Sequence, residues 1–155
     1  MVLLMSFWPE VYEKIIEQKK LVEYRRRMPM ECEYAFMYVS KPVKSICGII
    51  QFGTKHKLSD WEKYYINDSQ IMMRISEFKE KYNYGSEIIS VYKIKPIKLA
   101  DLREHVKGFV APQSYIILDN KPELFEYIKN NLVLKGEKID NNLNNIFPEH
   151  ICKRY

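Results

Sequence analysis

Residues 12–25 read YEKIIEQKKLVEYR, and this stretch decides how the chain begins to fold. The apolar residues of its first half recur at the spacing of one helical face, and a proline stands just upstream, where it favours the first turn of a helix. We therefore expect a helix from Pro9 to about Gln18. From Lys20 to Arg26 the side chains alternate in character, which predicts a strand directly after the helix.

Short apolar segments on both sides of this unit predict further strands, over residues 2–7, 33–40, 45–55 and 87–94. These segments are rich in β-branched and aromatic residues. No strand-helix-strand rhythm repeats along the chain, which argues against a doubly wound sheet. The expected fold class is α+β, with a mixed, partly closed β-barrel of about five or six strands and flanking helices.

Single residues mark where elements are expected to start, bend and stop. Ser59 stands at capping-box spacing from Glu62 and predicts a helix start, and Ser76 predicts the start of a second helix. Pro96 predicts the end of a strand. Gly48 predicts a bulge, or the close approach of another backbone, within a strand.

The composition is that of a folded protein that does not span a membrane. With 155 residues, of which 46% are apolar and 29% charged, the chain fits one domain, and no apolar run approaches the roughly 20 residues of a membrane-spanning helix. Its cysteines, Cys32, Cys47 and Cys152, are odd in number and widely spaced, which argues against a disulfide framework. We expect a reducing compartment, the cytoplasm.

Several kinds of site are excluded by motif. The chain has no phosphate-loop glycine run, no dinucleotide fingerprint, no Cys-x-x-Cys pair and no His-Glu-x-x-His helix. Its three histidines are scattered. We therefore expect neither a metal nor a cofactor.

A dense run of charge joins the first helix to the next strand. The formal net charge is +5, and residues 1–57 hold most of the excess, with 10 Lys or Arg against 6 Asp or Glu. Strand alternation places Glu23 and Arg25 on one face, with Lys20 close by at the turn. A carboxylate between cations can orient an arginine toward a phosphate or a base edge. The alternative is a solvated, charged strand edge that resists aggregation.

Three segments in order resemble the activating signal cointegrator homology, or ASCH, family. The helix, turn and Lys-x-x-Glu-x-Arg of residues 12–25 resemble its signature. Residues 37–48 are similar to its strand-turn-strand with Ser-x-Pro, and residues 96–99 with 112–115 resemble its closing segment. The resemblance covers about residues 1–120, and residues 121–155 are expected to add a helix from Pro122 and a polar tail.

The resemblance implies a PUA-like β-barrel whose cleft includes Lys20, Glu23 and Arg25 as ligand-binding residues. Ser40 matches the family's serine at a strand end and is expected to line the same cleft. The family usually has a glycine where Gln18 or the residue after it stands here, which puts the turn geometry in question.

Three functions remain open at this stage. The first is an RNA- or nucleotide-binding module, with Lys20 and Arg25 on phosphate and aromatic rings stacking on bases. The second is a small hydrolase, either an amidohydrolase acting on a modified nucleoside or a nuclease, with Lys20 as nucleophile or base and Glu23 assisting. The third is a protein-interaction or regulatory module. Catalysis, ligand identity and oligomeric state are left undecided.

Overall fold

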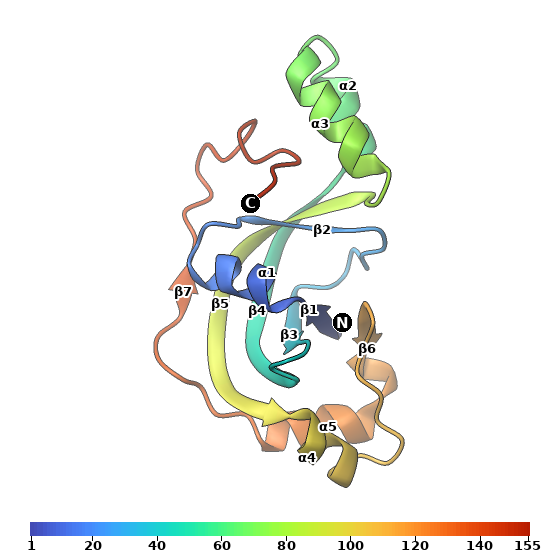
Figure 1. The fold of residues 1–155 in the computed structure, drawn as a ribbon, viewed down its shortest axis with the longest axis vertical. Helices are drawn as coiled ribbons and strands as arrows, with labels where there is room; N and C mark the ends of the chain where they lie inside the picture. Colours follow the sequence, from blue (N-terminus) through green and yellow to red (C-terminus); the bar gives the residue numbers. More distant parts are fainter.

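The computed structural model describes residues 1–155, and its strands form one strongly curled sheet (Figure 1). The strands follow the order β2-β5-β4-β3-β1-β6, and a short seventh strand, β7, pairs with β5. Their bounds are β1 Val2–Phe7, β2 Val22–Arg25, β3 Tyr34–Val39, β4 Ser45–Lys57, β5 Tyr84–Lys98, β6 Tyr115–Ile117 and β7 Ile139–Asp140.

The sheet is mixed and partly closed, as expected. β1 runs parallel to β3, and every other pairing is antiparallel. The long strands β4 and β5 bend along their length, and their pairing shifts register at three points. The α+β prediction of a mixed, partly closed barrel of about five or six strands is therefore confirmed.

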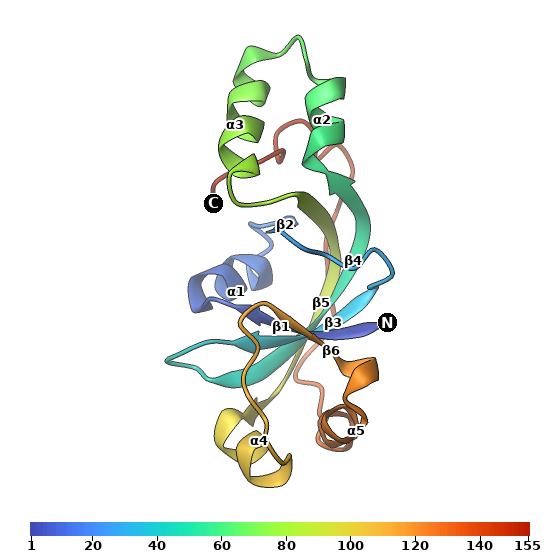
Figure 2. The ribbon, with the colours of Figure 1, turned by 90° about the vertical axis from the view of Figure 1, so that its right-hand side faces the viewer.

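Helices cover the sheet on one side and at both ends. α1 packs beside the sheet, the α2 and α3 hairpin stands at one end, and α4 and α5 stand at the other (Figure 2). The α-helices are α1 Pro9–Ile16, α2 Leu58–Tyr64, α3 Ser69–Lys79, α4 Leu99–His105 and α5 Pro122–Asn130. A short 3-10 helix, η1, spans Leu118–Asn120. No helix is both long and apolar enough to cross a membrane.

Of the two helix starts predicted between β4 and β5, the one near Ser59 is confirmed and the one at Ser76 is wrong. α2 begins one residue before Ser59, and its N-cap side chain makes no capping hydrogen bond. α3 begins seven residues before Ser76, because the Asp68 carboxylate accepts the Ile71 N–H at 3.1 Å and caps the helix there. Aspartate caps helices as well as serine does, so the sequence pattern alone could not show that Asp68 and not Ser76 starts this helix.

The predicted stop at Pro96 is also wrong, because β5 continues through it to Lys98. The β4–β5 pairing shifts register between Ile46 and Gly48, so Ile97 faces Ile46 while Lys93 faces Gly48. Pro96 lies in the segment that this shift leaves out of the ladder. A proline without an N–H is tolerated where no ladder hydrogen bond is required.

The C-terminal tail completes a separate part of the core. Its apolar side chains Ile146, Ile151 and Cys152 pack with Tyr24 of β2 and Trp61 of α2. The tail has little regular structure, as expected, yet it packs against β2, the strand that follows α1.

Gly48 shows the close backbone approach that its position predicted. A Cβ atom at Gly48 would stand 2.9 Å from the carbonyl oxygen of Tyr92, a backbone atom that cannot turn aside. At Gly53 the nearest atoms belong instead to the flexible Ile89 side chain, at 3.1 Å.

We predict that Gly48→Ala lowers the free energy of unfolding by roughly 1–3 kcal/mol, the usual cost of overpacking, because β4 and β5 must separate locally. Gly53→Ala is the matched control and should cost clearly less. Denaturant titration of the two variants measures the difference. Equal stability of the two would contradict the proposed clash.

Candidate functional site

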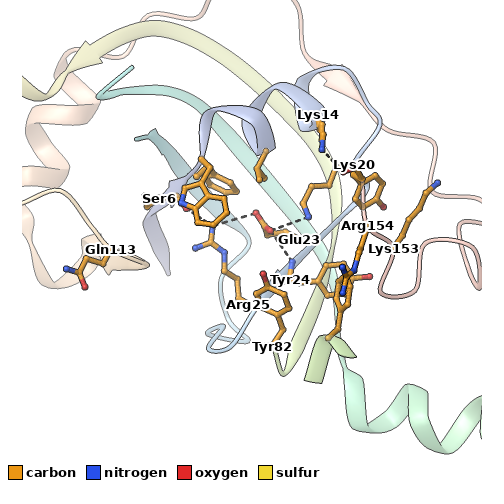
Figure 3. A pocket seen from close by; sticks show the side chains of 15 residues that line it. Ser6, Lys14, Lys20, Glu23, Tyr24, Arg25, Tyr82, Gln113, Lys153 and Arg154 are labelled. Atoms are coloured by element: carbon orange, nitrogen blue, oxygen red, sulfur yellow. Dashed lines mark hydrogen bonds and ion pairs between the residues drawn. The ribbon is translucent and has the colours of Figure 1, made fainter. Parts of the chain in front are cut away.

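One pocket lies where the end of β1, the start of α1, β2, α3 and the C-terminal tail meet (Figure 3). Its volume is about 340 Å³, within the range typical of small-ligand sites. Its lining includes one acidic residue, Glu23, and five cationic ones: Lys14, Lys20, Arg25, Lys153 and Arg154. The aromatic residues of the lining are Phe7, Trp8, Tyr24, Phe78, Tyr82 and Tyr155.

The carboxylate of Glu23 is buried between two cations. Glu23 is only 6% exposed, and its Oε1 and Oε2 atoms lie 3.6 Å from Lys20 Nζ and from Arg25 Nη2, respectively. The Tyr24 N–H donates to Oε1 at 3.1 Å, whereas Oε2 accepts no hydrogen bond. The structure therefore brings together Lys20, Glu23 and Arg25, the three residues that the strand period and the turn had grouped.

Arg25 also spans the space between separate strands. Its Nη2 donates to the carbonyl oxygen of Ser6 in β1 at 2.7 Å, and its Nη1 donates to that of Ser114, just before β6, at 3.4 Å. The guanidinium carbon lies 4.9 Å from the centre of the Phe7 ring. Arg25 is thus committed to the fold as well as to the pocket.

Lys20 keeps donors available to a ligand. Its side chain is 11% exposed, and its ammonium lies 5.5 Å from the ring centre of Tyr24 and 5.3 Å from that of Tyr155. The 3.6 Å separation from Glu23 is too long for a strong hydrogen bond. An ammonium has three N–H groups, and this one stands at the pocket wall among aromatic rings.

The C-terminal tail supplies a wall of the pocket that sequence reasoning missed. The Tyr24 hydroxyl donates to the His150 carbonyl oxygen and accepts the Cys152 N–H, each at 2.7 Å. The Lys14 ammonium donates to a main-chain oxygen of Tyr155. The apolar side chains within this mainly polar segment are the one signal in the sequence that the tail docks, and they are Leu143, Ile146, Phe147, Ile151 and Cys152.

Trp8 stands at helical spacing from the apolar face of the first helix, but it is not buried with that face. It is instead the N-cap residue of α1, 70% exposed, at the pocket lining. Ser40 does not line the pocket, although its N–H donates to the carbonyl oxygen of Phe7 at 3.0 Å. Its role in ligand binding stays a prediction.

Other site chemistry finds little support. No group of three or more His, Cys, Asp or Glu side chains is placed to hold a metal ion. All three cysteines are buried free thiols, and burial raises the pKa of each, to about 12 for Cys152. A thiol with a raised pKa is a poor nucleophile at neutral pH.

Comparison with known proteins places the chain near one bacterial protein. No protein-family model matches. The ASCH domain-containing ribonuclease of Zymomonas mobilis is 32% identical over 123 residues, covering 70% of this chain and 78% of that relative.

Solved structures of ZmASCH from the same organism share the fold. A serine-to-alanine variant superposes with a TM-score of 0.62 at 23% identity, over 84% of this chain and 96% of that one. The crystal structure of ASCH from Zymomonas mobilis superposes with a TM-score of 0.56 at 24% identity, over 81% of this chain and 94% of that one. These likenesses confirm the predicted ASCH-type, PUA-like fold.

The tail wall contains a titratable contact. Burial raises the pKa of Tyr155 to about 12, so its hydroxyl stays protonated at neutral pH and lies 2.6 Å from His150 Nδ1. Burial, and secondarily the Lys153 ammonium, lower the pKa of His150, while Glu149 opposes them. Because the pKa of His150 is lower in the folded state, the neutral ring stabilises the docked tail at a pH above about 6.5, the histidine pKa in the unfolded chain. This stabilisation is lost as the pH falls through the lower pKa of the folded state.

We predict that acidification from pH 7 to pH 5 loosens residues 146–155. Amide hydrogen exchange should be faster in this segment of the wild type than in His150→Gln at the same acidic pH, because glutamine does not titrate. His105→Gln, on α4 outside the pocket, is the control and should behave as wild type. Identical exchange in all three proteins at pH 5 would refute the coupling.

Proposed function

The chain belongs to the ASCH domain family, and from this premise we propose that it binds single-stranded RNA or an RNA nucleotide in the pocket around Lys20, Glu23 and Arg25. The observation that carries the proposal is the charge of the lining, where five cationic side chains surround one buried carboxylate. Such a surface suits a phosphodiester, and the neighbouring rings suit bases. The name of the Zymomonas relative, a ribonuclease, supports RNA as the partner.

The roles of the three central residues follow from their contacts. Lys20 has free donors and would contact phosphate, whereas Arg25 would contribute the N–H groups that the Ser6 and Ser114 carbonyls leave unused. Glu23 would hold both cations in place. We propose that residues 1–120 and the tail form one functional unit, because both line the pocket. We also propose a cytoplasmic location, in keeping with the three free thiols.

Lys20→Met tests this proposal, since methionine retains much of the side-chain volume and removes the charge. We predict a loss of about 1.5–3 kcal/mol in affinity for single-stranded RNA, the range for a hydrogen bond to a charged group. The salt dependence of binding should also weaken, because one phosphate contact fewer releases fewer counterions.

Lys129→Met is the matched control, because Lys129 lies on α5 outside the pocket and pairs with Glu126 at 3.3 Å. Fluorescence anisotropy at several salt concentrations measures affinity, and thermal melting checks the fold. Unchanged RNA affinity in a folded Lys20→Met protein would overturn the assignment. Arg25→Ala is a less clean probe, because removing the bonds to Ser6 and Ser114 also costs stability.

RNA cleavage is the second candidate function, favoured over the amidohydrolase alternative by the name of the relative. In such a reaction the ribose 2′-oxygen attacks the adjacent phosphorus and loses its proton to a base. The 5′-oxygen of the next nucleotide leaves with a proton from an acid, which yields a 2′,3′-cyclic phosphate. Glu23 Oε2 accepts no hydrogen bond and is a candidate base, and Lys20 is a candidate acid.

We predict that Glu23→Gln, which keeps the shape but cannot take up the proton, reduces cleavage by about 100-fold or more while RNA binding falls less. Product analysis by mass spectrometry detects the cyclic phosphate, and reactions with and without a chelator compare metal dependence. If the wild type binds RNA but does not cleave it, the cleavage proposal is wrong and only the binding function remains. Hydrolysis of an acylated cytidine, with RNA intact, would instead favour the amidohydrolase.

A further inference from the structure

Trp8 is an exposed indole at the wall of the proposed RNA pocket. It is 70% exposed, whereas the chain's other tryptophan, Trp61, is 6% exposed and packs in the core. Trp61 stacks on His56 and contacts two further rings, but Trp8 makes no aromatic pair within the protein. A tryptophan buries a large apolar area when it finds a partner, so an uncovered one at a pocket points to a ligand.

The backbone around Trp8 is fixed on both sides. Trp8 is extended, with φ −69° and ψ 149°, and Pro9 follows it at the first turn of α1. Its carbonyl oxygen accepts the Tyr12 N–H at 2.9 Å, and the preceding Phe7 is buried beside Arg25. The indole is therefore attached to a defined point of the pocket wall, next to the central ion pairs.

The pocket has two chemically different sides. In Figure 3, Ser6 and Gln113 lie to one side of Glu23. Trp8 is only two residues after Ser6 in the sequence, so its backbone lies at this side of the pocket. Four of the five cations, Lys14, Lys20, Lys153 and Arg154, lie to the other side, whereas Arg25 reaches the Ser6 side through its hydrogen bond to the Ser6 carbonyl oxygen. Gln113 is exposed, and its amide offers a donor and an acceptor to a base edge. An aromatic face with an amide on one side, and four of the five cations on the other, match a base and its phosphate.

We propose that Trp8 is the stacking platform for one unpaired base of the RNA strand, with the phosphate of that strand on the cationic side of the pocket. This inference rests on the proposed RNA-binding function and adds the residue that would hold the base. A base within a duplex has both faces covered by its neighbours, so the pocket selects a single strand, a loop or an end. Stacking requires only a π-face and therefore tolerates any base.

The test compares two probes of equal charge. One is a single-stranded RNA octamer, and the other is an abasic ribose-phosphate octamer with the same number of phosphates. Trp8→Ala should weaken binding of the RNA octamer by about 5- to 140-fold, which corresponds to ~1–3 kcal/mol per stacked base, and leave the abasic octamer unaffected. Trp8→Phe should restore most of the affinity.

Tyr64→Ala is the matched control, because Tyr64 is 80% exposed but lies on α2 outside the pocket. The RNA octamer should quench tryptophan emission in the wild type and not in Trp8→Phe, where only Trp61 emits. An unchanged RNA affinity of Trp8→Ala, or an equal loss for both octamers, would overturn the stacking role and leave RNA binding intact. A wild type that binds neither octamer would overturn both proposals.

Discussion

The buried ion pairs of Glu23 are the constraint on which the pocket depends. A carboxylate that is 6% exposed must be compensated, because an isolated buried charge is far more costly than a paired one. Lys20 and Arg25 provide this compensation from positions three residues before and two residues after it. Their positions are thereby tied to the carboxylate, and the turn after α1 cannot shift without leaving a buried charge unpaired.

Arg25 extends this constraint to the sheet. β2 stands at one end of the strand order and β6 at the other, and no ladder joins them. The guanidinium bridges part of that opening, since it donates to carbonyl oxygens at the end of β1 and just before β6. The carboxylate orients the arginine, and the arginine holds the strands at a set separation. The opening of the half-barrel therefore remains as a pocket and does not collapse.

The parts of this arrangement that are local in sequence were predictable, and those that depend on distant contacts were not. The period of a strand groups Glu23 with Arg25, and the apolar pattern predicts most strands. The left-handed backbone at Gln18, with φ 62°, explains why a glycine suits the turn where this chain has glutamine. In contrast, nothing near Trp8 says that its side of α1 is open, since an apolar residue at helical spacing is usually buried. The docking of the tail depends on Tyr24, more than 120 residues away.

Four of the five cations of the pocket divide into two groups with different consequences for an anionic ligand. Lys20 and Arg25 compensate a buried carboxylate, so they would contact a ligand through their remaining N–H groups while both ion pairs with Glu23 stay in place. Lys153 and Arg154 pair instead with Glu149 and Glu77 at 3.2 and 3.0 Å, near the surface, where each of these side chains is at least 35% exposed. Exposed pairs contribute little to stability, and a phosphate can replace the acidic partner at small cost. Lys20 and Arg25 therefore set the geometry of the site, while Lys153 and Arg154 of the tail can move to contact the ligand.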